Sequence, residues 1–162
     1  MTGKLRNRLS IAASYFRHQT VLSGGPIEIT LESTAKCNLY CPMCPRHIYT
    51  FDNENMNLEL YKKVIQDCKD YVEFIWPYGI GEPMIHPNIF EMIRITRDAG
   101  IRTGMSTNAT LMDDRRADML LDSVDPSGLQ LGSSGVTTSV HLYGRGWETG
   151  RQSATVTASS VL

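Results

Sequence analysis

The stretch CNLYCPMC, residues 37–44, places Cys37, Cys41 and Cys44 within eight positions. The fourth cysteine of the chain, Cys68, follows 24 residues after Cys44. Three cysteines this close together cannot staple distant segments, so we do not expect a disulfide framework. We read no secretory signal at the N-terminus, and in a chain without one such a cluster more often binds a metal.

The segments around the cysteines alternate between strand and helix patterns. The first of them, residues 27–33, alternates Ile and Leu with Glu and Thr, as a strand does. The predicted strands are 27–33, 71–80 and 101–107, and the predicted helices are 5–19, 57–70, 89–99 and 113–123. Strand–loop–helix units at this spacing favour an α/β fold with a parallel sheet, preceded here by a short helix.

Several residues are predicted to begin, end or face these helices. We expect Asn57 to cap the second helix, Asn88 to cap the third in a capping box with Glu91, and Gly100 to stop it. Cys68 falls on the apolar face of the second helix, which favours a small buried side chain over a metal ligand. In the first helix, the Lys and Arg side chains are expected to be solvated.

Three unusual loops follow the predicted strands, at residues 37–47, 79–87 and 106–110. Right-handed crossovers bring the carboxyl ends of parallel strands to one edge of the sheet. That edge carries the chemistry in barrels and open α/β sheets alike. We therefore expect the three loops to converge.

The three cysteines of the loop are compatible with two kinds of metal site. A protein-held zinc ion needs four ligands, which Cys37, Cys41 and Cys44 would complete with His47. A [4Fe–4S] cluster normally has four thiolates, so three would leave one iron open to a small molecule. The other histidine near the loops, His86, is expected to be a turn or capping residue.

Three motifs, in order on three successive strand ends, resemble those of the radical S-adenosylmethionine (SAM) superfamily. They are CNLYCPMCPR at 37–46, GIGEP at 79–83 and STNATLM at 106–112. Ile80 stands where the family has the first Gly of Gly-Gly-Glu-Pro, and Ala109 stands where it has the Gly of Thr-Asn-Gly. The first motif is similar to members that often carry a C-terminal SPASM-type cluster domain. The resemblance implies the N-terminal half of a partial (β/α) TIM-like barrel.

The resemblance also implies cofactors and residue roles. Cys37, Cys41 and Cys44 would ligate a [4Fe–4S] cluster whose remaining iron binds SAM. One electron, from a donor such as a flavodoxin or ferredoxin, would cleave SAM to a 5′-deoxyadenosyl radical that abstracts hydrogen from substrate. The residues implied to contact SAM are Met43, Gly79, Ile80, Gly81, Glu82, Pro83, Ser106 and Asn108. The substrate is unknown, and a peptide is suggested only by analogy.

The composition changes near residue 126. Residues 126–162 contain three charged residues, Arg145, Glu148 and Arg151, and are rich in Ser, Thr and Gly. We therefore divide the chain into an N-terminal helix and linker (1–26), a partial core (27–125) and an atypical tail (126–162). The chain is expected to be a truncated or frame-shifted product whose tail is out of register, and the third strand is expected to lack an outer neighbour. An inert cluster-binding fragment is then an alternative to an active enzyme.

Charge and hydropathy exclude other classes. A formal net charge of -1 gives no basic face for nucleic acid. With no apolar run of 18 residues, we expect no membrane span. Free thiols and an oxygen-sensitive cluster point to the reducing cytoplasm.

Overall fold

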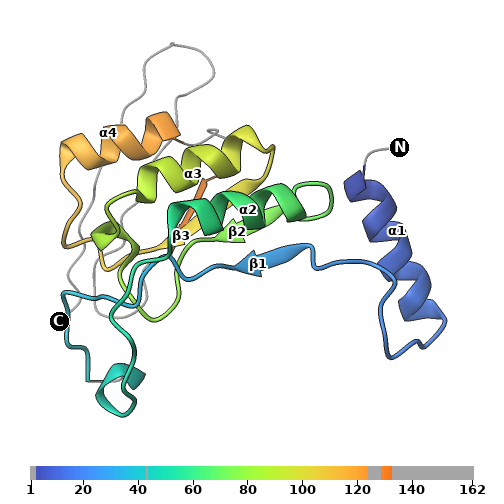
Figure 1. Cartoon of the computed structure of the whole chain (residues 1–162), viewed down its shortest axis with the longest axis horizontal. Helices are drawn as coiled ribbons and strands as arrows, with labels where there is room; N and C mark the ends of the chain where they lie inside the picture. The colour runs from blue at the N-terminus through green and yellow to red at the C-terminus, as the bar shows by residue number, and fades with distance from the viewer. Residues whose placement is uncertain (1–2, 43, 124–128, 133–162) are drawn as a thin grey trace.

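The protein is described by a computed structural model that covers residues 3–42, 44–123 and 129–132. Four parallel strands form one sheet in the order β1 (Glu28–Thr30), β2 (Phe74–Trp76), β3 (Arg102–Ser106) and β4 (Leu129–Gly132) (Figure 1). In this register Ile29 lies opposite Ile75, and Ile75 lies opposite Thr103. The predicted α/β fold with a parallel sheet is confirmed.

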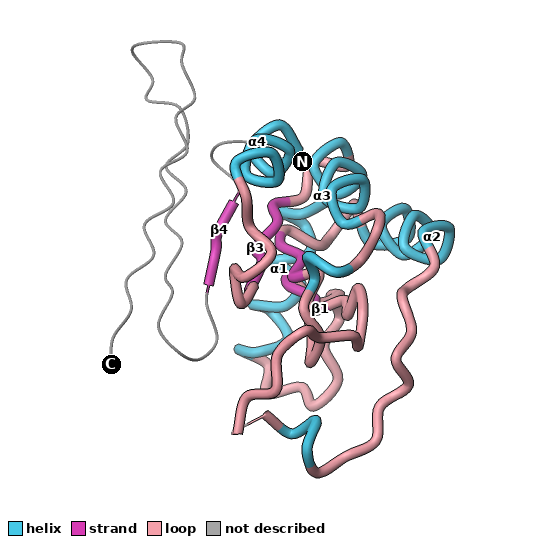
Figure 2. The backbone as a smooth tube through the Cα atoms, turned by 90° about the vertical axis from the view of Figure 1, so that its left-hand side faces the viewer, coloured by secondary structure: helices cyan, strands magenta, loops and turns pink. Residues whose placement is uncertain are grey.

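Three helices cover one face of this sheet. They are α2 (Leu58–Cys68), α3 (Ile89–Asp98) and α4 (Asp114–Ser123), and they lie side by side in Figures 1 and 2. Each predicted helix after the first is present within a residue or two of its expected bounds. The strands are shorter than expected, and β2 stops where Pro77, which has no N–H for a ladder, follows Trp76.

The core lies between the sheet and these helices. One cluster joins α2 to β2 through Tyr61, Ile65 and Ile75, and it includes Cys68. A second joins α3, β3 and α4 through Ile93, Met105 and Leu120. The inward face of α4 is as predicted, since Ala117, Leu120 and Leu121 are buried.

The opposite face of the sheet carries a row of aromatic side chains from β2 and its exit. Phe74, Trp76 and Tyr78 alternate with core residues, and the ring centroids are 4.8 Å apart for Phe74–Trp76 and 5.6 Å apart for Trp76–Tyr78. The Trp76 ring packs over Gly104, where a Cβ would come within 2.3 Å of it. Trp76 Nε1 donates to the carboxylate of Glu28. Gly104 therefore makes room on β3 for the indole of the neighbouring strand.

The first helix, α1 (Gly3–Phe16), lies at the end of the sheet where the strands begin (Figure 1). Its buried residues are polar: Asn7 exchanges hydrogen bonds with Gly25, and Ser14 bonds to Ser23. Its Arg side chains are exposed to solvent, as predicted, although Arg8 also pairs with Glu73, and Lys4 Nζ donates to Gly100 O. The hydrogen bond from Arg8 lowers the pKa of Glu73 below its ordinary value.

The helix-end predictions have mixed outcomes. Asn57 caps α2, its side chain accepting from the N–H groups of Glu59 and Leu60. Asn88 stands at the predicted N-cap position of α3, but its side chain makes no capping bond, so that part of the prediction is wrong. Its N–H instead donates to His86 Nδ1, which confirms His86 as a turn residue. Gly100 ends α3 with φ of +70°.

The expectation that β3 lacks an outer neighbour is also wrong. β4 pairs with β3 along its length, from Thr103 opposite Leu129 to Ser106 opposite Gly132. Four residues of the predicted tail therefore extend the sheet, and the rest of 126–162 lies outside the described residues. Among the described helices, none is long and apolar enough to cross a membrane.

Candidate functional site

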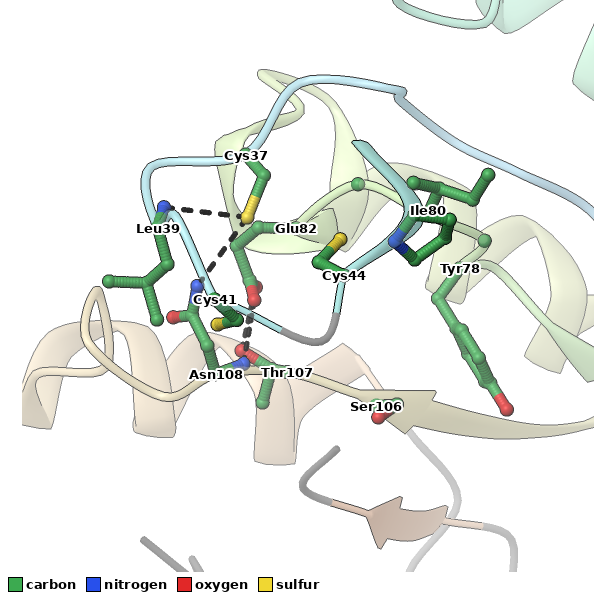
Figure 3. Close-up of a pocket in the computed structure, with 13 residues that line it drawn as sticks. Cys37, Leu39, Cys41, Cys44, Tyr78, Ile80, Glu82, Ser106, Thr107 and Asn108 are labelled. Carbon is green, nitrogen blue, oxygen red and sulfur yellow. Dashed lines mark hydrogen bonds between the residues drawn. The ribbon is translucent and has the colours of Figure 1, made fainter. Parts of the chain in front are cut away.

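The three strand-exit loops converge, as predicted, around one cavity. Its volume is about 350 Å³, and it lies at the carboxyl end of the sheet (Figure 3). Its lining residues come from the cysteine loop, the β2 exit and the β3 exit. They are Cys37, Leu39, Cys41, Cys44, Pro45, Tyr78, Gly79, Ile80, Gly81, Glu82, Ser106, Thr107 and Asn108.

All three clustered cysteines reach this cavity. Cys37, Cys41 and Cys44 are of intermediate exposure. Cys44 N–H donates to Cys41 O at 2.9 Å, a tight turn that brings the second and third cysteines to the same wall. Cys37 Sγ accepts from Leu39 N at 3.5 Å. Met43 and the side chain of His47 lie outside what the structure describes.

Cys68 takes no part in the site. It is 2% exposed in the core, and its Sγ donates to Ile65 O at 3.6 Å. Burial raises the pKa of its thiol. A buried, protonated thiol on the covered face of α2 is a packing residue, as predicted. The cavity therefore has three cysteine thiols.

Gly81 brings the β2 exit against the cysteine loop. A Cβ at this position would stand 2.0 Å from Thr34 O and 2.7 Å from Lys36 O. The next residue, Glu82, donates its N–H to Lys36 O at 2.7 Å. Because glycine has no Cβ, the β2 exit can approach the backbone of the cysteine loop this closely.

At Gly79, an added Cβ would meet a side chain rather than the backbone. A Cβ there would lie 2.5 Å from Glu32 Oε1, and that oxygen accepts the N–H of Ile80 at 2.7 Å. Glu32 thus orients the Gly79–Ile80 peptide at the cavity wall. Its role was not predicted, because a Glu at the end of an alternating strand is typical of a solvated residue.

Glu82 links the second loop to the third. It is 3% exposed, and its Oε1 accepts from Thr107 Oγ1 at 2.6 Å and from Met84 N at 3.0 Å. Its Oε2 accepts from Asn108 N at 2.7 Å. The carboxylate therefore places a negative charge in the cavity wall while three donors hold it in place.

The predicted contact residues fall into three groups. Those that line the cavity are Gly79, Ile80, Gly81, Glu82, Ser106 and Asn108. Pro83 does not line it but is buried at the start of a 3₁₀ turn, Pro83–Ile85. Met43 is outside the described residues. Lining residues that the motifs did not single out include Leu39, Pro45 and Thr107, which carry no distinctive chemistry in the sequence.

The geometry of the thiols distinguishes two kinds of metal site. Within the described residues, no group of three His, Cys, Asp or Glu side chains is arranged to hold one metal ion. Zinc thiolates sit about 2.3 Å from a single ion, so their sulfurs must crowd together. Thiolates of an iron–sulfur cluster bind different irons and are spread around the cluster. The donor set, three thiols around one cavity, fits a cluster better than a zinc ion.

Comparison with known proteins finds a matching family model and several relatives. The model of the "Radical SAM superfamily" matches residues 31–146, so the match continues past residue 125. A tungsten-containing aldehyde ferredoxin oxidoreductase cofactor-modifying protein of Pyrococcus furiosus is 37% identical over 86 residues, 52% of this chain and 24% of that protein. The PqqA peptide cyclase of Bradyrhizobium diazoefficiens is 26% identical, over 62% of this chain and 27% of the cyclase.

A solved structure shows the shared fold. SuiB of Streptococcus suis, bound to S-adenosylmethionine, aligns with a TM-score of 0.61 and 21% identity. The alignment covers 84% of this chain and 31% of SuiB. The chain thus spans about a quarter to a third of the length of these relatives.

Proposed function

Because the chain belongs to the radical SAM superfamily, we propose that it is the cluster-binding part of a radical SAM enzyme. The family implies an iron–sulfur cluster and SAM. We assign the cluster as [4Fe–4S], held by Cys37, Cys41 and Cys44. When bound, the pair supplies one-electron reductive cleavage of SAM to methionine and a 5′-deoxyadenosyl radical that takes a hydrogen atom from substrate.

The observation that carries this proposal is the number of available thiols. Three cysteines line the cavity, and Cys68 is sealed in the core. Three thiolates leave one iron without a protein ligand, and the family's cofactor has an amino and a carboxylate group to fill that position. A closed, four-ligand zinc site would need His47 as its fourth ligand.

The residues of the second and third loops would bind SAM. The β2 exit offers backbone carbonyls and the fixed carboxylate of Glu82 to the SAM ammonium group. Gly79 and Gly81 line the cavity from this exit, and Ser106 lines it from β3. Met43, next to the third cysteine, is proposed to pack against the adenine ring, where a thioether suits an aromatic edge.

We also propose a substrate class, an electron donor and a cellular compartment. A peptide is the substrate class to test first, because one relative is named as a peptide cyclase and SuiB has been solved with its precursor peptide. An electron donor such as a flavodoxin or ferredoxin would reduce the cluster, and an oxygen-sensitive cluster suits the reducing cytoplasm. Because the chain spans about a quarter of these relatives, turnover needs a direct test.

Anaerobic iron–sulfur reconstitution tests the proposal. The expected result is a broad absorption near 400 nm, about four irons per chain, and a paramagnetic resonance signal of the reduced cluster that changes when SAM is added. Single Ala variants of Cys37, Cys41 and Cys44 should each lose the cluster, and Cys68→Ala should retain it. Stoichiometric zinc without colour would instead establish the structural module. A cluster that forms no 5′-deoxyadenosine under reducing conditions would establish an inert fragment.

A further inference from the structure

Three side chains form a closed hydrogen-bonded ring between the cysteine loop and the β3 exit. Asn108 Nδ2 donates to Asn38 Oδ1 at 2.9 Å, and Asn38 Nδ2 donates to Thr110 Oγ1 at 2.8 Å. Thr110 Oγ1 completes the ring by donating to Asn108 Oδ1 at 2.8 Å. We call these residues, Asn38, Asn108 and Thr110, the loop clamp. It joins segments about 70 residues apart in the chain.

The amide of Asn108 has no hydrogen-bonding capacity left over. Besides the ring bonds, its Oδ1 accepts from Thr110 N at 3.0 Å, and its second Nδ2 hydrogen is directed to Cys37 Sγ at 4.0 Å. A primary amide has two hydrogens and two acceptor positions, and all four are used. Asn108 is therefore better suited to hold Cys37 than to bind a cofactor through its side chain.

Cys37 Sγ lies between two N–H donors. Leu39 N approaches from within the cysteine loop, and Asn108 Nδ2 approaches from the β3 exit, as the dashed lines in Figure 3 show. The two donors come from different segments, the cysteine loop itself and the β3 exit. The sulfur of Cys37 is thus tied to both segments.

We propose that the loop clamp positions Cys37, and that Asn108 is a positioning residue that also raises the reduction potential of the bound cluster. The first part concerns the chain alone; the second rests on the proposed function. An N–H donor to a ligating sulfur stabilises the extra negative charge of the reduced cluster, and hydrogen bonds to sulfur are among the factors that set cluster potentials. Removing the donor should make reduction harder.

The loop clamp should affect the cysteine loop rather than the stability of the whole fold. Asn38 and Thr110 are solvent-exposed, so their bonds contribute little to the global free energy of unfolding. Their effect should be local: they should limit the motion of the cysteine loop. The test must therefore follow that loop, which is distant in sequence from Thr110.

The first experiment measures hydrogen exchange in the cluster-free full chain. Thr110→Val removes the hydroxyl and keeps the shape, whereas Thr110→Ser keeps the hydroxyl. Thr110→Val should accelerate amide exchange in residues 37–42 by about threefold to tenfold, the factor that one net hydrogen bond contributes to an opening equilibrium. Thr110→Ser should exchange like the parent. Equal exchange in all three chains would overturn the positioning role, whether or not the chain binds iron.

The second experiment measures the midpoint potential of the reconstituted cluster. Asn108→Ala should shift it to a more negative value, while Asn88→Ala, whose side chain makes no capping bond, should leave it unchanged. An unshifted potential in Asn108→Ala would overturn the tuning role. A chain that assembles no cluster refutes the proposed function and with it the tuning role, while the exchange result still decides the positioning role.

Discussion

The carboxylate of Glu82 accepts the backbone N–H of Asn108, with 2.7 Å between Glu82 Oε2 and Asn108 N. This bond joins the β2 exit to the β3 exit. Glu82 N–H, in turn, donates to Lys36 O and joins the β2 exit to the cysteine loop. One residue of the GIGEP motif therefore fixes the positions of all three loops.

Glu82→Gln should destabilise the fold although it preserves size. A Gln amide offers an N–H₂ group where the carboxylate accepts from Asn108 N–H on one side and from Thr107 and Met84 on the other. One buried donor would then face another. The expected loss is about 1–3 kcal/mol in free energy of unfolding, measured by urea denaturation. Glu91→Gln on the exposed side of α3 is the control, and an equal midpoint for both variants would refute this account.

The two glycines of the β2 exit should differ in their response to Ala. At Gly81 the new Cβ would meet backbone oxygens, which cannot move without shifting the cysteine loop. At Gly79 it would meet the side chain of Glu32, which is exposed and can rotate away. Gly81→Ala should lower the free energy of unfolding by about 1–3 kcal/mol or more, the usual range for overpacking. Gly79→Ala should lower it by less than about 1 kcal/mol. Comparable thermal midpoints would contradict the contact that distinguishes them.

The fold was predictable because each local pattern agreed with the next. Asn57 before an apolar stripe, the alternation of Ile29 with its polar neighbours, and Gly100 after α3 each specify local structure that the tertiary fold keeps. The inward face of α1 was not predictable. Hydrophobic periodicity favours an apolar contact, whereas this helix docks through Asn7 and Ser14, whose partners lie in a loop that periodicity does not position.

The site was predictable to the level of loops, not of contacts. Strand ends of a parallel sheet meet at one edge, so the convergence of Cys37, Gly81 and Ser106 follows from topology alone. The bonds that fix the loops do not. Glu32 and Thr110 are ordinary polar residues in the sequence, and only the structure shows their partners, 48 residues and two residues away.

Ala109, which stands where the family has the Gly of Thr-Asn-Gly, has a strained backbone. Its φ is +59°, in the left-handed region that costs an L-residue about 1–2 kcal/mol. Ala109→Gly should therefore stabilise the chain, by about 0.5–1 kcal/mol after the larger entropy of an unfolded Gly is subtracted. Thermal unfolding measures the gain. Ala99→Gly is the matched control, because Ala99 has φ of -79° and should only lose stability.

Tyr61 gives the fold a dependence on alkaline pH. It is fully buried, and its hydroxyl lies 2.6 Å from Thr96 Oγ1, which itself donates to Met92 O. Tyr61 is therefore the donor to Thr96. Burial raises the pKa of the phenol from 10.0 to about 12. The folded state disfavours the phenolate. The contribution of the protonated phenol to the free energy of unfolding is therefore complete below pH 10 and is lost as the pH rises toward 12.

Tyr61→Phe should separate this effect from other groups that titrate in the same range. At neutral pH the variant should lose about 1 kcal/mol, the net worth of one hydrogen bond. Between pH 10 and 12 its free energy of unfolding should fall less steeply than that of the parent, so the difference between them narrows. Tyr15→Phe is the control, since Tyr15 is 73% exposed. Denaturant curves across this pH range measure all three chains, and parallel slopes for Tyr61→Phe and the parent would show that the phenol ionises equally easily in the folded and unfolded states.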